Sequence, residues 1–433
     1  MMQCVLRADQ ALVDGHLRPA SVGVSAGRIE FIGPVDADYS AAEEIRIPDT
    51  AVLLPGFVDT HVHINDPGTD WEGFDTATAA AAAAGTTTLV DMPLDCDPVT
   101  TSVAALNVKK AAAEDNCHVD MGYWGGVVPG NLDQLAPLQR AGVRGFKCFL
   151  ADSGNPHFPQ LTPAQFRDAM ARVADLGSVM LVHAESHRVI DAGPAPSGRR
   201  YRSFLASRPD AAEADAVALV IDTARETGAR AHVAHVSSAA VLSRLAAAKR
   251  AGIAVTAETC PHYLTFTAEA VPDGGTEFAC CPPIRDGANR EMLWSALHDG
   301  TLDLVVSDHS PCAPQLKADG DFGRAFGGIS SLQLSPRAVW TQAAARGFGL
   351  ADLSRWMSEQ PAALAGYSDR GRIAVGMRAD LCSFDPDVEE TVSATTLRHR
   401  HPVSPYDGVR LRGSVLQTWV AGRPALARIG ETV

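Results

Sequence analysis

The sequence has no long uninterrupted hydrophobic run, no cluster of basic residues and few cysteines for its length. Its longest uncharged stretch lies between Asp75 and Asp91, and this stretch is mostly alanine and threonine. It is shorter than the ~20 apolar residues that a membrane-spanning helix needs. Lysine and arginine number 37 against 51 aspartates and glutamates, a net charge of −14. An acidic chain without basic clusters argues against binding to nucleic acid or to an anionic membrane.

Cysteine is scattered rather than concentrated. Nine cysteines, an odd number, are spread from Cys4 to Cys382 in 433 residues, which is not the density of a disulfide-rich scaffold. The first ten residues contain Arg7 and Asp9, which interrupt any apolar core of a signal peptide. Hydrophobic residues make up 46% of the chain, as in globular proteins with a large core. We therefore expect a soluble protein in a reducing, cytoplasmic compartment.

The sequence pattern changes near residue 53 and again near residue 366. Residues 1–52 contain short alternating runs separated by glycines, and this pattern returns over 367–433. Between them, short β-branched runs alternate with alanine-rich helical stretches, which is typical of a parallel sheet covered by helices. Eight such units over roughly 300 residues fit a (β/α)8 barrel. We predict an α/β fold: a TIM-type barrel over 53–366 and a small β-sandwich domain from 1–52 and 367–433.

Helix and loop signals support this division. The predicted barrel strands are 52–63, 86–92, 117–123, 145–150, 179–183, 232–236, 255–258 and 302–307. Thr162, Pro163 and Gln165 have the spacing of a capping box at a helix start, and Gly228 ends a helix predicted over 210–227. Residues 191–209 and 311–328 are rich in glycine, proline and charge. Barrel enzymes place their working loops after strand ends, so we expect these two segments to cover an active site rather than to be functionless surface loops.

Histidines and an aspartate occur at the ends of several predicted strands. His61 and His63 are two residues apart in an extended segment, so their side chains point to the same side. His183 ends a later strand, His235 lies in the next one and Asp308 follows the last. A single such histidine is more often a hydrogen-bonded core residue than a ligand. Together, however, these residues predict a metal site, since imidazole and carboxylate suit zinc and similar ions.

Lys147 is unusual because it lies in the apolar segment 145–150 with no acidic residue beside it. A lysine in such a place usually extends its amine to solvent. A buried amine instead has a lowered pKa and becomes nucleophilic. It can then take up carbon dioxide as a carbamate, whose two oxygens can bridge two metal ions. The predicted strand stands between the other ligand strands, which permits this second interpretation.

Several long segments resemble the cyclic amidohydrolases of the amidohydrolase superfamily. The opening signature is Leu-Pro-Gly-Phe-Val-Asp-Thr-His-Val-His at 54–63, and the similarity continues to the segment 371–381 near the end of the chain. Within this family, five further segments are similar to those of allantoinases: 146–150, 152–154, 258–263, 280–285 and 307–312. These motifs are long and specific.

The resemblance implies a metal-dependent hydrolase with two divalent ions, zinc first and manganese, cobalt or nickel as alternatives. One ion would be held by His61, His63 and Asp308 and the other by His183 and His235, with carboxylated Lys147 bridging them. A hydroxide between the metals would attack the ring carbonyl of allantoin, and Asp308 would act as catalytic base and then acid. The product would be allantoate. The implied substrate contacts are Asn65, Ser153, Cys281 and Ser310, and the implied assembly is a homotetramer.

One loop departs from the family pattern. Allantoinases commonly have His-x-His-x-Asn-Glu-Pro-Gly-Arg at the first strand, whereas here Asp66 replaces the glutamate and Thr69 follows Gly68 in place of the arginine. We expect an altered first loop, with an effect on substrate affinity and none on the metal ligands. His232 is predicted to be structural because it falls on the opposite face of its strand from His235. The roles of His262, Tyr263 and His309 stay open.

Three related functions compete with allantoin hydrolysis. Hydantoinases and dihydropyrimidinases resemble this chain but carry a tyrosine five residues after the bridging lysine, where this chain has Asp152. Dihydroorotases need an arginine two residues after the second histidine, where Asn65 offers a neutral amide that suits a neutral ureide. Non-catalytic assembly proteins of this fold have lost metal ligands, whereas all six are present here. Allantoin hydrolysis is thus the first expectation and hydantoinase activity the alternative.

Overall fold

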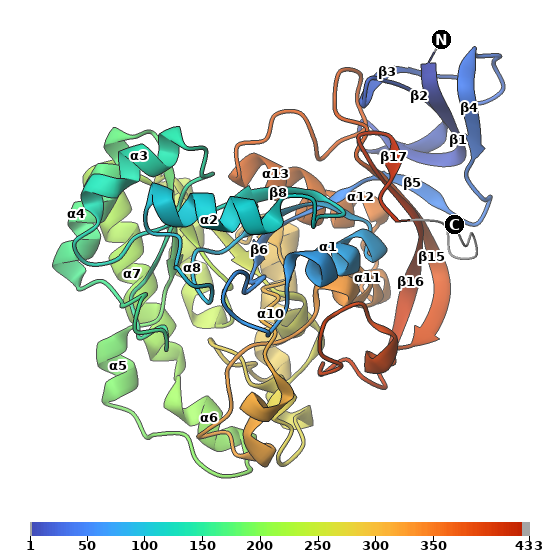
Figure 1. Ribbon diagram of the computed structural model, residues 1–433. Helices are drawn as coiled ribbons and strands as arrows, with labels where there is room; N and C mark the ends of the chain where they lie inside the picture. Colours follow the sequence, from blue (N-terminus) through green and yellow to red (C-terminus); the bar gives the residue numbers. More distant parts are fainter. Residues whose placement is uncertain (1, 427–433) are drawn as a thin grey trace.

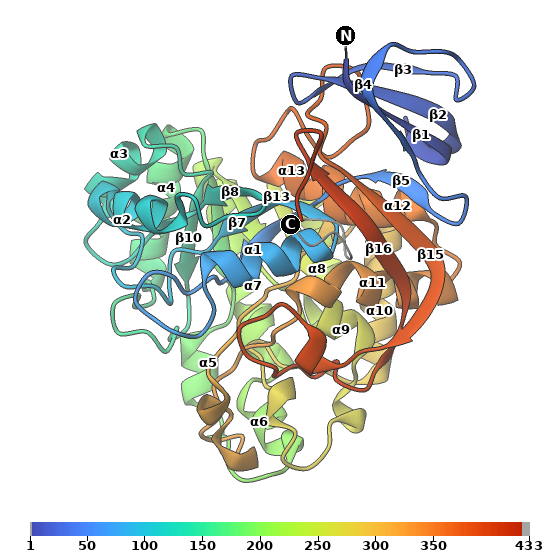
Figure 2. The same cartoon turned by 45° about the vertical axis from the view of Figure 1, so that its right-hand side comes forward.

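The computed structural model describes residues 2–426 and consists of a helix-covered barrel with a smaller β domain beside it (Figure 1). The barrel is formed by the middle of the chain. The strands of the small domain come from both chain ends and lie together on one side of the barrel (Figure 2). The predicted α/β fold, a TIM-type barrel with a β-sandwich domain, is therefore confirmed.

Eight strand positions close the barrel. The first three are β6 (Phe57–Val62), β7 (Thr86–Asp91) and β8 (Asp120–Tyr123), which β9 (Gly125–Gly126) continues after one residue; the others are β10 (Phe146–Phe149), β11 (Val179–His183), β12 (Arg230–Val233), β13 (Val255–Thr259) and β14 (Leu304–Val305). All neighbouring pairs are parallel. A parallel bridge between Val62 and His309 connects the last strand position to the first. The ends of all strands therefore meet around one opening.

Helices between the strands cover the outside of the barrel. These are α1 (Phe74–Ala83), α2 (Val103–Ala113), α3 (Leu135–Arg140), α4 (Pro163–Asp175), α7 (Asp210–Thr227), α8 (Leu242–Arg250), α10 (Gly287–Asp299) and α11 (Ser335–Ala345). The predicted end signals are confirmed: Thr162 and Gln165 form a capping box at α4, and Gly228 ends α7 in the left-handed conformation. Within residues 2–426 we find no helix whose length and apolar character would let it cross a membrane.

The described part of the chain also contains five short α-helices. They are α5 (His187–Asp191), α6 (Tyr201–Ser207), α9 (Pro261–Thr265), α12 (Leu350–Ser354) and α13 (Gln360–Leu364). In Figure 1, α5 and α6 lie below the barrel, apart from the helices that cover its sides. Both follow β11; α6 lies within the segment 191–209 predicted to cover the active site, whereas α5 ends where that segment begins.

The small domain is built around a single hydrogen-bonded sheet. Its strands are β1 (Met2–Val13), β2 (His16–Ser25), β3 (Arg28–Gly33), β4 (Ala41–Arg46), β5 (Val52–Pro55), β15 (Leu381–Thr391), β16 (Arg410–Val420) and β17 (Arg423–Pro424). Side chains from both chain ends share its core, for example Leu6 and Val22 with Leu381 and Trp419. The two ends fold together as predicted, because neither could bury its apolar face alone.

One detail of the predicted strands is wrong. The continuous strand expected over 52–63 is divided at Gly56: β5 pairs with β15 in the small domain, whereas β6 belongs to the barrel. A Cβ atom at Gly56 would collide with the side chain of Thr87, so the chain passes close to β7 where it changes sheets. The domain boundary predicted between residues 52 and 53 therefore falls inside β5.

Candidate metal centre and active site

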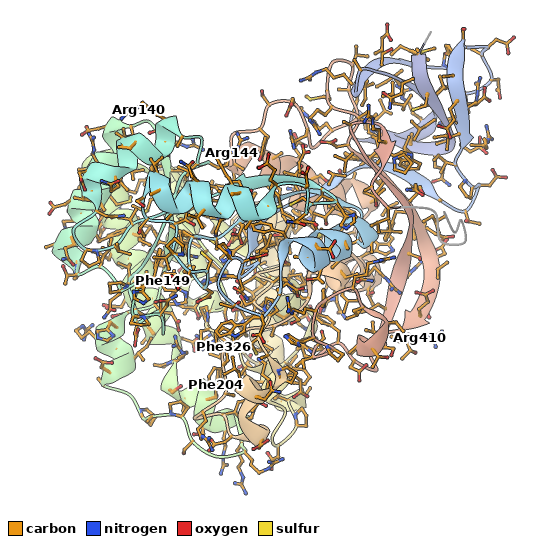
Figure 3. All side chains as sticks on the ribbon, viewed as in Figure 1. Arg140, Arg144, Phe149, Phe204, Phe326 and Arg410 are labelled. Carbon is orange, nitrogen blue, oxygen red and sulfur yellow. The ribbon has the colours of Figure 1, made fainter. Side chains whose placement is uncertain are left out.

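A cavity of about 910 Å³ opens at the end of the barrel where the strands finish. Its floor includes His61, His63, Lys147, His183 and Asp308. Figure 3 shows the lining side chains Phe149, Phe204 and Phe326 in the lower half of the molecule, whereas Arg140 and Arg144 lie at the opposite end of the barrel. The cavity is therefore at the carboxyl ends of the strands, where barrel enzymes have their active sites.

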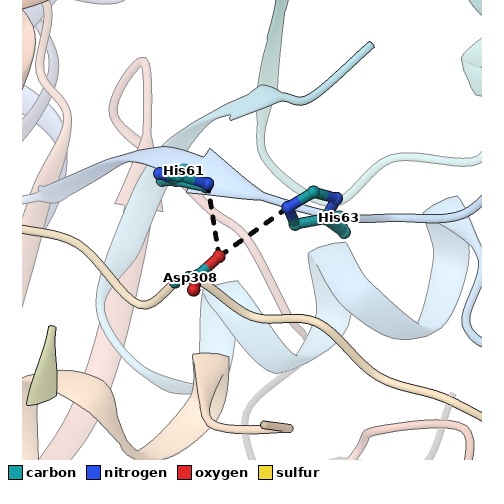
Figure 4. Close-up of side chains that lie close together, drawn as sticks. All are labelled: His61, His63 and Asp308. Carbon is teal, nitrogen blue, oxygen red and sulfur yellow. Dashed lines mark ion pairs between the residues drawn. The ribbon is translucent and has the colours of Figure 1, made fainter. Parts of the chain in front are cut away.

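Three of the predicted metal ligands converge at the first and last strand positions. The Nε2 atom of His61 lies 3.2 Å from Oδ1 of Asp308, and Nε2 of His63 lies 3.7 Å from the same oxygen (Figure 4). Two donors bound tetrahedrally at ~2.1 Å to one ion lie ~3.4 Å apart, so these separations suit a shared ion. Asp308 reaches this position through a left-handed backbone conformation, with φ 46°. The chain turns there, which no strand pattern predicts.

His183 and His235, the ligands predicted for a second ion, lie beside this group. Their ring centroids are 4.6 Å apart, and that of His235 is 5.3 Å from that of His61. The ring of His183 stacks on Phe149, with centroids 4.6 Å apart and an angle of 12°. His235 also has a positive φ, 37°. The four histidines thus form one continuous group on the cavity floor.

Lys147 lies among these histidines and is fully buried, with 0% of its surface exposed. Among the described residues its Nζ atom has no hydrogen-bond partner, and the centroid of the Phe149 ring is 5.3 Å away. An unpartnered buried amine is costly. The alternative that this amine extends to solvent is therefore wrong. Burial lowers the pKa of Lys147, while the carboxylates of Glu258 and Asp308 oppose this shift.

The electrostatics of the site favour neutral imidazoles. Burial lowers the pKa of His61 to about 4, with a further contribution from Lys147. Burial and neighbouring histidines hold the pKa values of His63 and His235 well below the usual value. Burial raises the pKa of Asp308, and Lys147 opposes that rise. Neutral imidazole is the form that binds metals. The buried donors His61, His63 and Asp308 therefore fit a metal ion, and the unpartnered amine of Lys147 lines the same cavity.

Two carboxylates behind the ligands orient them, and sequence reasoning missed both. Oε1 of Glu258 contacts Nδ1 of His61, and its Oε2 lies 2.9 Å from Nε2 of His232. Oε2 of Glu185 lies 2.7 Å from Nε2 of His183 and also accepts from Nη1 of Arg208. A carboxylate on one ring nitrogen leaves the other nitrogen free for a metal. Glu185 lies two residues after His183, a spacing from which its contact with His183 could have been predicted. No sequence pattern indicated the contacts of Glu258 and Arg208.

The other histidines and the tyrosine considered in the sequence analysis make contacts of their own. The ring of His232, predicted to be structural, bonds to Glu258 and Thr256. His309 is also structural: its Nε2 lies 3.2 Å from Glu72, and its Nδ1 accepts from the backbone N–H of Ser331. The hydroxyl of Tyr263 donates to the carbonyl of Pro282.

Three of the four predicted substrate contacts line the cavity. These are Ser153, Cys281 and Ser310. Asn65 is buried, its Nδ2 donates to the carbonyl of Pro311, and it is not among the described residues that line the cavity. This bond places Asn65 in support of the loop after Asp308. The roles of all four in binding substrate stay predictions.

The two segments predicted to cover the site both line the cavity. Phe204 and Arg208 come from 191–209, and Phe322 and Phe326 from 311–328. The segments are joined by hydrogen bonds, since the N–H of Phe322 donates to the carbonyl of Gly198 over 2.9 Å. In the altered first loop, Trp71 packs edge-on against Phe326, with centroids 4.9 Å apart. This loop therefore forms part of the same wall.

Comparisons with known proteins identify the family of this chain. The model of the amidohydrolase family matches residues 52–425. The chain is 49% identical to the allantoinase of Streptomyces avermitilis, covering 98% of this chain and 96% of the relative, and 39% identical to the allantoinase of Saccharomyces cerevisiae, covering 96% and 94%. Among solved structures, L-hydantoinase (dihydropyrimidinase) from Arthrobacter aurescens matches with a TM-score of 0.94 at 30% identity, covering 100% of this chain and 98% of that one. The chain therefore belongs to the amidohydrolase family and, within it, to the allantoinases.

Proposed function

We propose that this protein hydrolyses a ring amide bond of allantoin to give allantoate. The observation that carries the proposal is the convergence of His61, His63, His183 and His235 with Asp308 around the buried amine of Lys147. The 49% identity to an allantoinase over nearly the whole chain supports the choice of substrate.

Six side chains would hold the metals. His61, His63 and Asp308 would hold one divalent ion, His183 and His235 a second, and the carbamate formed from Lys147 and carbon dioxide would contact both. When bound, such ions polarise a carbonyl and lower the pKa of water. Zinc is the first choice, and manganese, cobalt and nickel accept the same donors.

Asp308 is the residue that we assign to proton transfer. Its carboxylate accepts a proton from the attacking water and returns it to the departing ring nitrogen, so that water is added across the carbon–nitrogen bond. Burial raises the pKa of Asp308 towards the working range, which suits a group that must both take and give a proton. Ser310 lies beside it, with Oγ 3.4 Å from Oδ1.

The cavity wall favours a small, neutral, polar substrate. Asp152, in place of the tyrosine of hydantoinases, lines the cavity together with Asn155 and His157. These groups offer acceptors and donors to a ureido group. Trp71 and Phe326 provide the apolar part of the wall.

The test is to supply allantoin, hydantoin, dihydrouracil and dihydroorotate separately and to compare rates of hydrolysis. We expect allantoin to be hydrolysed fastest. A faster reaction with hydantoin or dihydrouracil would favour the hydantoinase alternative. Fewer than one bound ion per chain after metal-supplemented expression would favour a non-catalytic assembly protein.

We further propose a homotetramer in a reducing, cytoplasmic environment, with allantoin as the small-molecule partner. The nine cysteines, which all lie in the described part of the chain, are free thiols. This agrees with a reducing compartment. Size-exclusion chromatography coupled to light scattering tests the assembly.

A further inference from the structure

A second group of metal-ligating side chains adjoins the candidate centre. Sγ of Cys260, a ring nitrogen of His262 and a carboxylate oxygen of Asp308 all lie within 4.8 Å of one another. Cys260 immediately follows β13, and His262 lies in the short helix α9. Both are fully buried, whereas Asp308 borders the cavity. An ion entering from the cavity would therefore meet Asp308 first.

His262 is the side chain that the rest of the structure leaves unexplained. Neither its Nδ1 nor its Nε2 has a hydrogen-bond partner within residues 2–426, although the ring is 0% exposed. By contrast, His61, His183 and His232 each use a ring nitrogen to contact a buried carboxylate. Burial lowers the pKa of His262 to about 3, so the ring is neutral and one nitrogen has a free lone pair. Buried polar groups normally have a partner, and a metal ion would supply one here.

Cys260 determines which ions would suit this group. Its side chain is fully buried and offers a sulfur donor to the group. On binding, the sulfur–hydrogen bond breaks, the proton leaves to solvent and a sulfur–metal bond forms. Sulfur, nitrogen and carboxylate together suit zinc or cadmium and do not suit magnesium or calcium.

We propose that Cys260, His262 and Asp308 bind one thiophilic divalent ion, and that this ion inhibits the enzyme. Inhibition follows because the ion occupies the carboxylate that the candidate centre needs for proton transfer. Only the inhibition rests on the proposed function. The binding itself rests on the three buried donors. Zinc above the amount that fills the main centre is the physiological candidate.

The experiment uses cadmium as the probe, added to the metal-loaded protein. A bond between cadmium and a thiolate gives an ultraviolet charge-transfer band, whereas binding to imidazole or carboxylate alone gives none. We expect the band to saturate at one equivalent of cadmium per chain while the rate of hydrolysis falls in step. Excess zinc should produce the same loss of rate.

Three variants locate the site. Cys260→Ser should lose the band, and cadmium should no longer lower the activity that the variant retains. His262→Gln, which keeps the thiol, should weaken cadmium binding by at least the ~10–100-fold that loss of a supporting partner costs at a metal site. His262→Gln also tests the site if Cys260→Ser does not fold, which circular dichroism would show. Cys281→Ser is the matched control, because Cys281 lines the cavity but lies outside the group, and this variant should keep the band.

A band that persists in Cys260→Ser, or one that disappears in Cys281→Ser, would overturn the proposal. So would inhibition by cadmium without any band. If the protein proves inactive on allantoin, the band and its response to the variants still test the binding site, so the two proposals can fail separately.

Discussion

Arg208 connects the segment that covers the site to the predicted metal ligand His183 through Glu185. Its removal should lower both the stability of the fold and the retention of metal. Its Nη1 donates to Oε2 of Glu185, the same oxygen that Nε2 of His183 contacts over 2.7 Å. Burial by itself would raise the pKa of Glu185, but Arg208 and His183 hold it below the usual value. The carboxylate is thus charged in the folded protein. Arg208→Met keeps much of the side-chain volume and removes this compensating charge.

The expected loss of stability follows from the burial of the ion pair between Arg208 and Glu185. Removing one partner of a buried ion pair costs about 3–5 kcal/mol, because the other charge stays buried and uncompensated. The side chain of Glu185 is 0% exposed and that of Arg208 is 19% exposed, so solvent offsets part of the cost. We expect the free energy of unfolding to fall by about 3 kcal/mol. A looser His183 should also release metal to a chelator roughly 10–100-fold more readily.

Urea unfolding of the metal-free protein and the rate of metal transfer to a chelator measure the two effects. Arg188→Met is the matched control: Arg188 pairs with Asp215 over 3.2 Å, and its side chain is 77% exposed, so the loss should be at most ~1 kcal/mol. A double variant, Arg208→Met with Glu185→Gln, should regain part of the stability because the buried charge is gone. Equal losses in Arg208→Met and Arg188→Met would refute the reasoning.

Three further predictions concern other parts of the molecule. Lys147→Met should abolish hydrolysis but leave the metal-free protein at least as stable as the wild type. The reason is that an apolar chain replaces an unpartnered buried amine. A lower melting temperature of the variant would contradict this prediction. Dialysis against a chelator should abolish activity, and zinc or manganese should restore it; full activity without bound metal, measured by atomic absorption, would contradict the metal centre. Thr162→Ala removes the capping box of α4 and should lower the free energy of unfolding, measured with urea, by about 1 kcal/mol while kcat stays unchanged. Arg167→Ala is the neutral comparison, because its partner Glu226 is exposed.

Local patterns in the sequence determined most of the elements that position the site. The spacing of His61 and His63 places both rings on one side of β6, because successive side chains of a strand alternate. The alternation of strands and helices predicted the barrel, and the capping residues predicted the start of α4 and the end of α7. Each of these signals depends only on residues that are neighbours along the chain.

The tertiary structure alone decided which groups support the ligands. Glu258 of β13 contacts both His61 of β6 and His232 of β12, and Arg208 reaches Glu185 across 23 positions of sequence. Gly56 divides one apolar run between two sheets, and His309 turns to Glu72 instead of the cavity. No spacing rule predicts such contacts, because the closing of the barrel, and not local backbone geometry, determines which distant side chains share one buried, low-dielectric space.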